Sequence, residues 1–309
     1  VVNLLDHLND AQREAASCVE GPLLIFAGAG TGKTRVITHR IARLIYDIGI
    51  PAENILAVTF TNKAAQEMRE RLTRLADNTG AADAARRVFF ATFHRFCAWL
   101  LRNHGEIVGV KRHFTIYDQA DSIHLVRQIL KSMDVESSLY RPSVILSIID
   151  RAKNDMRSPA DIAASADGPV GKKAARVFVE YETRLRAAAA LDFTDLLVYT
   201  VTALRSSPQL LKYLQERFTY ILVDEYQDTN RAQYEILRMM AAHGNLCVVG
   251  DDDQSIYSWR GADIRNILSF EKDFPDARVV KLEQNYRSTP AILDMANRVI
   301  RNNSSRADK

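Results

Sequence analysis

The stretch Ala27-Gly28-Ala29-Gly30-Thr31-Gly32-Lys33-Thr34 decides the fold of this chain. It follows an apolar run at residues 23–26 and precedes a helical pattern over residues 35–46. A strand, a glycine-rich loop and a helix that opens with Lys-Thr form the context of a phosphate-binding loop. Small residues let backbone N–H groups close around phosphate oxygens, and the helix N-terminus adds partial positive charge. We call residues 27–34 the phosphate loop.

The chemistry of such a loop assigns roles to individual side chains. Lys33 would reach the β- and γ-phosphates of a nucleotide, and the Thr34 hydroxyl would bind Mg²⁺. A tight turn without a ligand is the alternative, but it gives no reason for Lys-Thr at this place. The strict pattern has glycine at position 27, and an alanine there matters only if the backbone needs a positive φ. The other nucleotide-binding residues predicted here are Ala27, Gly28, Ala29, Gly30, Thr31, Gly32 and Arg35.

Length and composition set the class of protein. A chain of 309 residues exceeds one ordinary core and predicts two domains. No apolar run has the length of a membrane span and no secretory signal pattern is present, so we expect a cytoplasmic protein. The three cysteines lie far apart and form no metal-binding pattern, which favours reduced thiols. The net charge of +3 indicates a polyanionic partner only weakly.

Short apolar runs alternate with helical patterns along much of the chain. Alternation of this kind predicts an α/β fold with a mainly parallel sheet covered by helices on both faces. Because ligands bind at the carboxyl ends of such strands, the phosphate loop, Asp224 and Asp251 should meet there. The expected strands are residues 23–26, 55–60, 88–92, 220–223, 246–249 and 279–282, with helices such as 63–75 and 232–242 between them.

Between about residues 114 and 217 the alternation stops. Apolar residues there recur at helical spacing, as in Val126, Ile129 and Leu130, and Pro142 could open a further helix. This pattern predicts an all-helical subdomain inserted into the α/β domain. Residues 158–171 are rich in Ala, Gly, Pro and Asp, and we expect a loop there.

Two carboxylates end the apolar strand at residues 220–223. Asp224 would hold Mg²⁺, and Glu225 would orient and deprotonate the attacking water. The next strand end leads to three aspartates and Gln254, whose amide can donate to a γ-phosphate oxygen and accept from water. Trp259, a little further on, could belong either to the core or to a ligand site.

Eight ordered motifs resemble the UvrD/Rep/PcrA family of superfamily 1A DNA helicases. The resemblance runs across nearly the whole chain and implies a P-loop RecA-like ATPase. Besides the phosphate loop, the matching stretches are Leu8-Asn9-Asp10-Ala11-Gln12, Ala57-Val58-Thr59-Phe60-Thr61-Asn62-Lys63-Ala64-Ala65, Ala91-Thr92-Phe93-His94, Leu191-Asp192-Phe193, Val223-Asp224-Glu225-Tyr226-Gln227-Asp228-Thr229-Asn230, residues 250–261 and Leu282-Glu283-Gln284-Asn285-Tyr286-Arg287-Ser288-Thr289.

The resemblance implies further roles at the nucleotide. Gln12 would read the adenine edge, Tyr286 would stack on the adenine, and Arg287 would contact the γ-phosphate as an arginine finger. With these, the predicted catalytic residues are Lys33, Asp224, Glu225, Gln254 and Arg287.

The resemblance also implies a track for single-stranded DNA, on which aromatic side chains stack with bases. Arg151, Ala152, Lys153 and Asn154 resemble a phosphate-contacting segment of the inserted domain. The predicted DNA-binding residues are Phe60, Thr61, Asn62, Lys63, Thr92, Phe93, His94, Lys153, Asn154, Tyr257, Trp259 and Arg260.

The implied organisation has four parts. Residues 1–110 and 191–279 would form the first RecA-like domain, residues 111–190 the helical insertion, and residues 280–309 the start of a second RecA-like domain. Members of the family continue through that second domain, so we expect this chain alone to show little ATPase activity and no unwinding.

The expected function of the complete protein is 3′-to-5′ translocation and unwinding of DNA in repair or replication. Its partners would be ATP, Mg²⁺, single-stranded DNA and single-strand/duplex junctions, with repair or replication proteins as possible further partners. A nucleotide-gated DNA-binding module without motor activity is the alternative. A P-loop kinase would not explain the aromatic and basic segments near Phe60 and Trp259.

Overall fold

A computed structural model describes residues 4–77, 82–134, 140–166 and 168–302. The chain divides into two compact units. Unit 1 comprises Val1–Phe93, Lys212–Thr229 and Leu237–Lys309, and unit 2 comprises His94–Leu211 and Asn230–Ile236. The predicted α/β class is confirmed, and the insertion of one unit within the other agrees with the break in the alternating pattern.

A six-stranded sheet forms the centre of unit 1. Its order is β3-β2-β6-β7-β1-β8, and every neighbouring pair is parallel. The strands are β1 (Leu23–Ala27), β2 (Ile55–Thr59), β3 (Phe89–Thr92), β6 (Tyr220–Val223), β7 (Leu246–Gly250) and β8 (Arg278–Leu282). All six predicted strands are present, with ends that differ by no more than one residue.

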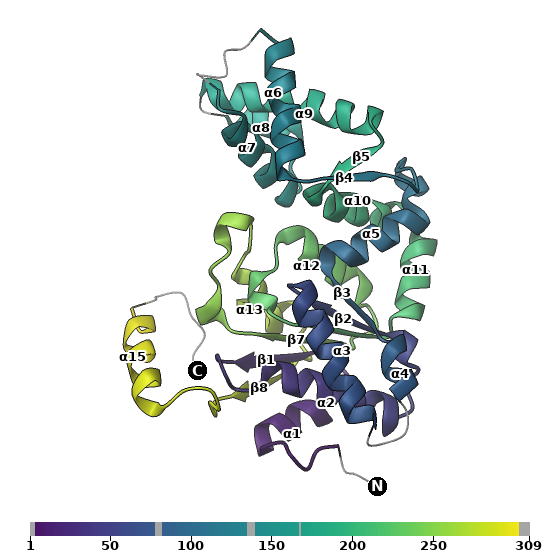
Figure 1. Cartoon of the computed structure of the whole chain (residues 1–309), viewed down its shortest axis with the longest axis vertical. Coiled ribbons are helices and arrows are strands. Elements are labelled where there is room, and N and C mark those ends of the chain that lie inside the picture. The colour runs from purple at the N-terminus through teal and green to yellow at the C-terminus, as the bar shows by residue number, and fades with distance from the viewer. Residues whose placement is uncertain (1–3, 78–81, 135–139, 167, 303–309) are drawn as a thin grey trace. The chain divides into compact units, whose positions relative to one another are not determined.

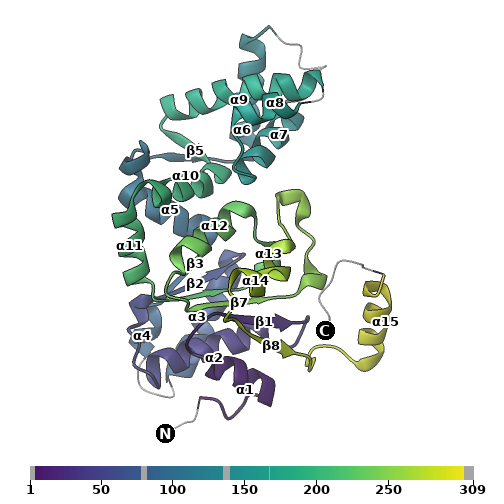
Figure 2. The same cartoon turned by 180° about the vertical axis from the view of Figure 1, so that it is seen from behind.

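Helices cover both faces of this sheet, as parallel strands require. In both views α1 and α2 lie below β1 and β7, and α13 lies above these two strands (Figures 1 and 2). The helices that lie wholly or partly in unit 1 are α1 (Asp10–Ser17), α2 (Lys33–Tyr46), α3 (Asn62–Asp77), α4 (Ala82–Arg87), α11 (Pro208–Arg217), α12 (Arg231–Met240), α13 (Arg265–Leu268), α14 (Phe270–Asp273) and α15 (Pro290–Ile300). Short 3-10 helices are η1 (Ala52–Asn54), η3 (Tyr226–Asp228), η4 (Asp252–Gln254) and η5 (Ser258–Arg260).

The core of unit 1 follows from side-chain alternation along the strands. Leu23 and Ile25 of β1 face the same core cluster as Val36 and Ile41 of α2 and Leu72 of α3. The intervening residues of β1 are also buried, so the strand is covered on both faces. Apolar runs without polar alternation, as at residues 23–26, are therefore what a central parallel strand needs.

Unit 2 is mostly helical. Helices α6, α7 and α9 share one apolar core that includes Val126, Ile149 and Phe178. The helices that lie wholly or partly in this unit include α5 (Phe93–His104), α6 (Gln119–Ser132), α7 (Pro142–Asn154), α8 (Pro159–Ser165), α9 (Pro169–Ala187) and α10 (Phe193–Ser206), with η2 (Gly105–Val108) after α5. None of the helices among the described residues is both long and apolar enough to span a bilayer.

Two expectations for this unit were wrong. The segment 158–171 is not a loop, because it contains α8 and the start of α9. Ser158 caps α8 by accepting from the Asp161 N–H, Asp161 bonds back to Ser158, and Ile162 is buried. The unit is also not purely helical: β4 (Thr115–Tyr117) and β5 (Ala190–Asp192) pair in parallel. Three-residue strands are too short for periodicity to reveal them.

The domain boundaries differ from the predicted ones. Unit 2 begins at His94 and ends its first segment at Leu211, whereas residues 111–190 were expected. The boundary expected at residue 280 falls inside β8, which pairs with β1 along its whole length, from Leu23↔Arg278 to Ala27↔Leu282. Backbone pairing therefore makes β8 the edge strand of the first sheet.

Lys153 does not face solvent, which corrects its prediction as a DNA contact. Only 3% of the side chain is exposed, and its ammonium group lies 2.6 Å from Asp195, 2.8 Å from Asp192 and 2.9 Å from Glu182. Burial opposes the charge, but the three carboxylates outweigh it and raise the Lys153 pKa well above its ordinary value. Neighbouring Asn154 accepts a hydrogen bond from Asn230 at 2.8 Å.

Replacing Lys153 with Met should destabilise the protein by about 3–5 kcal/mol, because the buried Asp192 and Asp195 and the half-buried Glu182 lose their cation. The urea unfolding midpoint of Lys153→Met measures this loss, with Lys172→Met, at an exposed position of α9, as the matched control. Single-strand affinity of the folded variant should not change. If Lys153→Met unfolds at the same urea concentration as the control but binds DNA more weakly, the predicted phosphate contact of Lys153 would be supported instead.

Candidate nucleotide-binding and DNA-binding sites

The phosphate loop has the backbone that its glycines suggest. Gly30 has φ +74° and Gly32 has φ +91°, both in the left-handed region that favours glycine. A side chain at Gly30 would also lie 2.6 Å from the Arg287 Cβ. Ala27 is the buried last residue of β1 and is not among the positive-φ residues, so alanine fits there without strain.

The start of α2 presents its backbone to a ligand. Gly32 precedes the helix and provides no side-chain cap for the first N–H groups. Uncapped N–H groups at a helix start are donors for an anion. Lys33 is the first residue of the helix, and its Nζ lies 3.1 Å from the Glu225 Oε2. The structure thus brings together the predicted phosphate-binding lysine and the predicted general base.

Gln12 supports the phosphate loop from α1. Its Nε2 donates to the Thr31 carbonyl oxygen at 2.9 Å, and its Oε1 accepts from the Asn9 N–H at 3.3 Å. The residue is 1% exposed, and a side chain at Gly32 would lie 2.8 Å from its Nε2. Both ends of the amide therefore hold protein groups, and the adenine contact of Gln12 stays a prediction.

The segment 284–288 docks on the phosphate loop. The Tyr286 N–H donates to the Gly30 carbonyl oxygen at 2.9 Å, and the Asn285 side chain donates to the Ala29 carbonyl oxygen. The Tyr286 hydroxyl accepts from Asn9 at 2.8 Å, while its side chain is 56% exposed. This docking places Tyr286 and the exposed Arg287 beside the loop. Sequence reasoning assigned no role to Asn285 or Asn9, although both lie in the matching stretches.

Asp224 and Glu225 follow β6 and differ in their surroundings. Burial raises the Asp224 pKa to about 7, the Glu225 charge acts in the same direction, and Lys33 opposes both. A divalent cation would favour the charged carboxylate. Glu225 has φ +52°, a left-handed backbone that is strained for a residue with a side chain. Strain of this kind is typical of sites that must aim a side chain.

The loop after β7 lies beside the phosphate loop. A side chain at Gly28 would lie 4.0 Å from the Asp251 Oδ2. The same oxygen accepts from the Gln254 Nε2 at 2.5 Å, and the Asp251 Oδ1 accepts from the Asp253 N–H at 3.2 Å. Gln254 is therefore held at the edge of the sheet where the phosphates are expected, and Asp251 lies between it and the phosphate loop.

An aromatic row continues from this loop. The rings of Phe60 and Tyr257 stack with centroids 5.1 Å apart and planes at 23°. The Trp259 ring lies 6.3 Å from Tyr257 and is 72% exposed, so Trp259 is not a core residue. We call Phe60, Tyr257 and Trp259 the aromatic row. Thr61, Asn62 and Lys63 beside it are exposed, and the Arg260 side chain lies outside the part that the structure describes.

Residues 92–94, which were predicted to bind DNA, are buried or half-buried. Phe93 is only 6% exposed and belongs to the packed interior, which corrects its prediction as a base contact. The His94 ring meets Phe193 edge to face at 5.7 Å, and burial lowers the His94 pKa. Thr92 is half-buried at the end of β3. Any DNA contact of this segment would come from Thr92 or a neutral His94.

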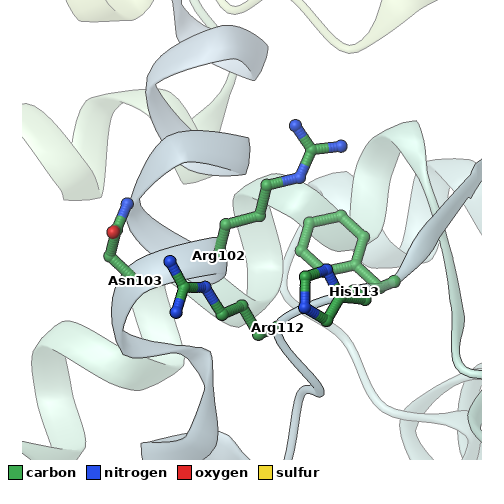
Figure 3. Close-up of a pocket in the computed structure, with 5 residues that line it drawn as sticks. Arg102, Asn103, Arg112 and His113 are labelled. Atoms are coloured by element: carbon green, nitrogen blue, oxygen red, sulfur yellow. The ribbon is translucent and has the colours of Figure 1, made fainter.

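A basic cavity lies on unit 2 outside all predicted sites. It has a volume of about 450 Å³ and is lined by Arg102, Asn103, Arg112, His113 and Phe114 (Figure 3). The Arg102 guanidinium lies 5.4 Å from the centre of the buried Phe114 ring. The lining polar side chains include no carboxylate, so the cavity suits a phosphate or another anion.

The comparisons with known proteins agree with this geometry. Residues 8–275 match the UvrD/REP helicase N-terminal domain. The chain belongs to the UvrD/REP helicase family.

Several "ATP-dependent DNA helicase PcrA" proteins of this family resemble the chain along its length. One from Staphylococcus aureus (strain Mu50) is 48% identical over 307 residues, 99% of this chain and 41% of that protein. One from Leuconostoc citreum is 47% identical over 310 residues, 100% of this chain and 41% of that protein. One from Staphylococcus epidermidis is 46% identical over 307 residues. The chain spans about two fifths of the length of these relatives.

The ordinary φ of Ala27 makes a prediction for this UvrD/REP chain. Ala27→Gly, which restores the strict loop pattern, should leave nucleotide affinity unchanged and destabilise β1 by about 0.5–1 kcal/mol, because glycine loses more backbone freedom on folding. Calorimetric titration with ATP and urea unfolding measure the two quantities. Tighter nucleotide binding in Ala27→Gly would mean that the alanine strains the loop.

Proposed function

We propose that this chain is the ATP-binding and single-strand-binding part of an ATP-dependent DNA helicase that translocates 3′ to 5′. The observation that carries the proposal is the meeting of two chemistries at one sheet edge in unit 1. The Lys33–Glu225 pair lies at the ends of β1 and β6, and the aromatic row extends from β2 and β7. In this proposal a nucleotide-hydrolysis site and a base-stacking surface share one edge of the same sheet.

ATP would bind along the phosphate loop. The N–H groups at the start of α2 and the Lys33 ammonium would neutralise phosphate charge, and Tyr286 would stack on the adenine with Gln12 and Arg35 at its edge. Arg287, which the segment 284–288 holds beside the phosphate loop, would contact the γ-phosphate. The docking of Asn285 and Tyr286 on the loop supports this placement.

Hydrolysis needs a water, a base and charge neutralisation. Glu225 would accept the proton of the attacking water, and Gln254 would orient the γ-phosphate. Hard oxygen ligands suit Mg²⁺, and the Thr34 hydroxyl and the Asp224 carboxylate are such ligands. Mg²⁺ bound with the nucleotide would screen the phosphate oxygens from the Asp224 and Glu225 carboxylates. The raised Asp224 pKa supports this assignment, because a buried carboxylate without a cation resists ionisation.

Single-stranded DNA would bind on the aromatic row. Exposed Trp259 and the stacked Tyr257 and Phe60 offer aromatic rings on which any base can stack. Stacking of this kind suits a protein that moves along DNA regardless of its sequence. Lys63 is exposed beside the row and would contact the backbone phosphates, and the phosphate contact of Arg260 stays a prediction from the sequence. The basic cavity offers the guanidinium donors of Arg102 and Arg112 and would contact phosphates of a junction.

The complete protein would work in DNA repair or replication through a second RecA-like domain. Helix α15 supports this part of the proposal. It has no buried residue, and Ile292, Met295 and Val299 are 57–72% exposed on it. An amphipathic helix with a bare apolar face needs a partner. A second domain packed there would bring further groups to the nucleotide.

The first test removes the phosphate-binding lysine. Lys33→Ala in the complete protein should lower DNA-stimulated ATP turnover by at least about a hundredfold, because the β- and γ-phosphates lose their cation. Lys212→Ala, at an exposed position of α11, is the control and should behave as wild type. Unchanged turnover in Lys33→Ala, measured by phosphate release, would contradict the assignment of the phosphate loop.

The second test removes the exposed aromatic. Trp259→Ala should weaken single-strand affinity by about 1–3 kcal/mol, the contribution of one stacked base, and leave ATP affinity unchanged. Ile256→Ala, a similarly exposed apolar residue of the same segment, is the control. Fluorescence anisotropy with a labelled oligonucleotide measures the affinity. An equal effect of the two substitutions would remove the aromatic row from the DNA site.

A further inference from the structure

Gln227 connects the two halves of the proposed hydrolysis site. It is 1% exposed and lies two residues after Glu225. Its Nε2 donates to the Glu225 Oε2 at 2.9 Å and lies 3.5 Å from the Asp228 Oδ2, and its Oε1 accepts from the Asp251 N–H at 3.0 Å. Only this orientation of the amide serves both neighbours, because the reverse would place a carbonyl oxygen against the Glu225 carboxylate.

The space around the amide is fully used. A side chain at Gly250, the last residue of β7, would lie 2.7 Å from the Gln227 Oε1. The absence of a Cβ at Gly250 therefore lets the amide approach the end of β7 closely. A buried amide that meets both neighbours in this way is costly to disturb, since a lost partner leaves an unsatisfied polar group.

The hydrogen bonds leave one oxygen of Glu225 for chemistry. Lys33 and Gln227 both donate to Oε2. Among the described residues, no hydrogen bond to Oε1 is present. Two donors on Oε2 thus fix the carboxylate while Oε1 can accept a proton. Because Glu225 also has a strained backbone at φ +52°, its direction depends on these partners.

The same amide reaches the loop that carries Gln254. Asp251, whose N–H bonds to Gln227, accepts from the Gln254 Nε2 through its Oδ2. A continuous chain of contacts therefore runs from Lys33 through Glu225, Gln227 and Asp251 to Gln254. Tyr257 and Trp259 follow three and five residues later.

We propose that Gln227 is a positioning residue that aims Glu225 at the water and links it to the loop between Asp251 and Trp259. The inference rests on the proposed ATPase function and deepens it. A shift of Gln254 toward or away from a γ-phosphate would reach Glu225 through one buried amide. DNA on the aromatic row, at the end of the same loop, would then alter hydrolysis through Gln227.

The test is Gln227→Glu in the complete protein, because this change keeps size and keeps the acceptor for the Asp251 N–H. It removes the donor to Glu225. At pH 8 we expect kcat of DNA-stimulated ATP hydrolysis to fall by about ten- to a hundredfold, with KM for ATP within about threefold. As the pH falls, the introduced carboxyl gains a proton and again donates, so the loss should shrink.

Gln233→Glu is the matched control. Gln233 is 6% exposed, and its Oε1 accepts from the Asn230 N–H at 3.0 Å, a bond that a carboxylate makes equally well. This variant should keep wild-type kcat and pH profile. Thermal unfolding of both variants shows whether the fold is retained.

Two results would overturn the inference. One is wild-type kcat and pH profile in Gln227→Glu. The other is a loss that is constant with pH and accompanied by an equal loss of ATP affinity, which indicates a general structural defect. Failure of the proposed function looks different: the wild-type complete protein would then hydrolyse no ATP with DNA present, and the positioning role would fall with it.

Discussion

The parallel pairing of all six strands is the constraint on which the site depends. Because parallel strands point the same way, every loop that follows a strand leaves the sheet at the same edge. The order β6-β7-β1-β8 then sets four such loops side by side. The phosphate loop, Asp224 and Glu225, the loop with Gln254 and the segment with Arg287 meet for this reason, although Arg287 lies 253 positions after Thr34.

The close approach of the loops at this edge requires glycines without a Cβ and buried amide side chains. Gly30, Gly32 and Gly250 each lie where a Cβ would come within 3 Å of a neighbouring side chain. The amides of Gln12 and Gln227 occupy the space that results, and each bonds to two protein groups. Such amides fix geometry without adding charge beside phosphates. The strained Glu225 backbone is stable only within this framework.

Much of this arrangement could be predicted from the residues. The apolar runs located the strands, because a covered parallel strand needs an unbroken apolar stretch. The meeting of the phosphate loop with the Asp224 segment followed from their places after strands, whereas the ion pair between Lys33 and Glu225 was not predicted. The prediction for Lys153 was wrong because a lysine in a basic segment is usually exposed and able to contact DNA. Its carboxylate partners Asp192, Asp195 and Glu182 are distant in sequence. The burial of Lys153 depends on how the helices pack and cannot be read from the local sequence. The prediction for Phe93 was wrong for a similar reason, since an aromatic residue in a motif that resembles a DNA-binding motif can belong to the protein interior. Gln227 gave no signal beyond being polar after a strand.

The central claim is that ATP hydrolysis and single-strand binding are coupled in the protein that contains this chain. The most direct measurement is the steady-state ATPase rate of the complete protein with and without a single-stranded oligonucleotide, at saturating ATP and Mg²⁺. We expect a low rate without the oligonucleotide and a rate at least about tenfold higher with it. A rate that is the same in both conditions would contradict the central claim, because the aromatic row would then have no connection to the Lys33–Glu225 site.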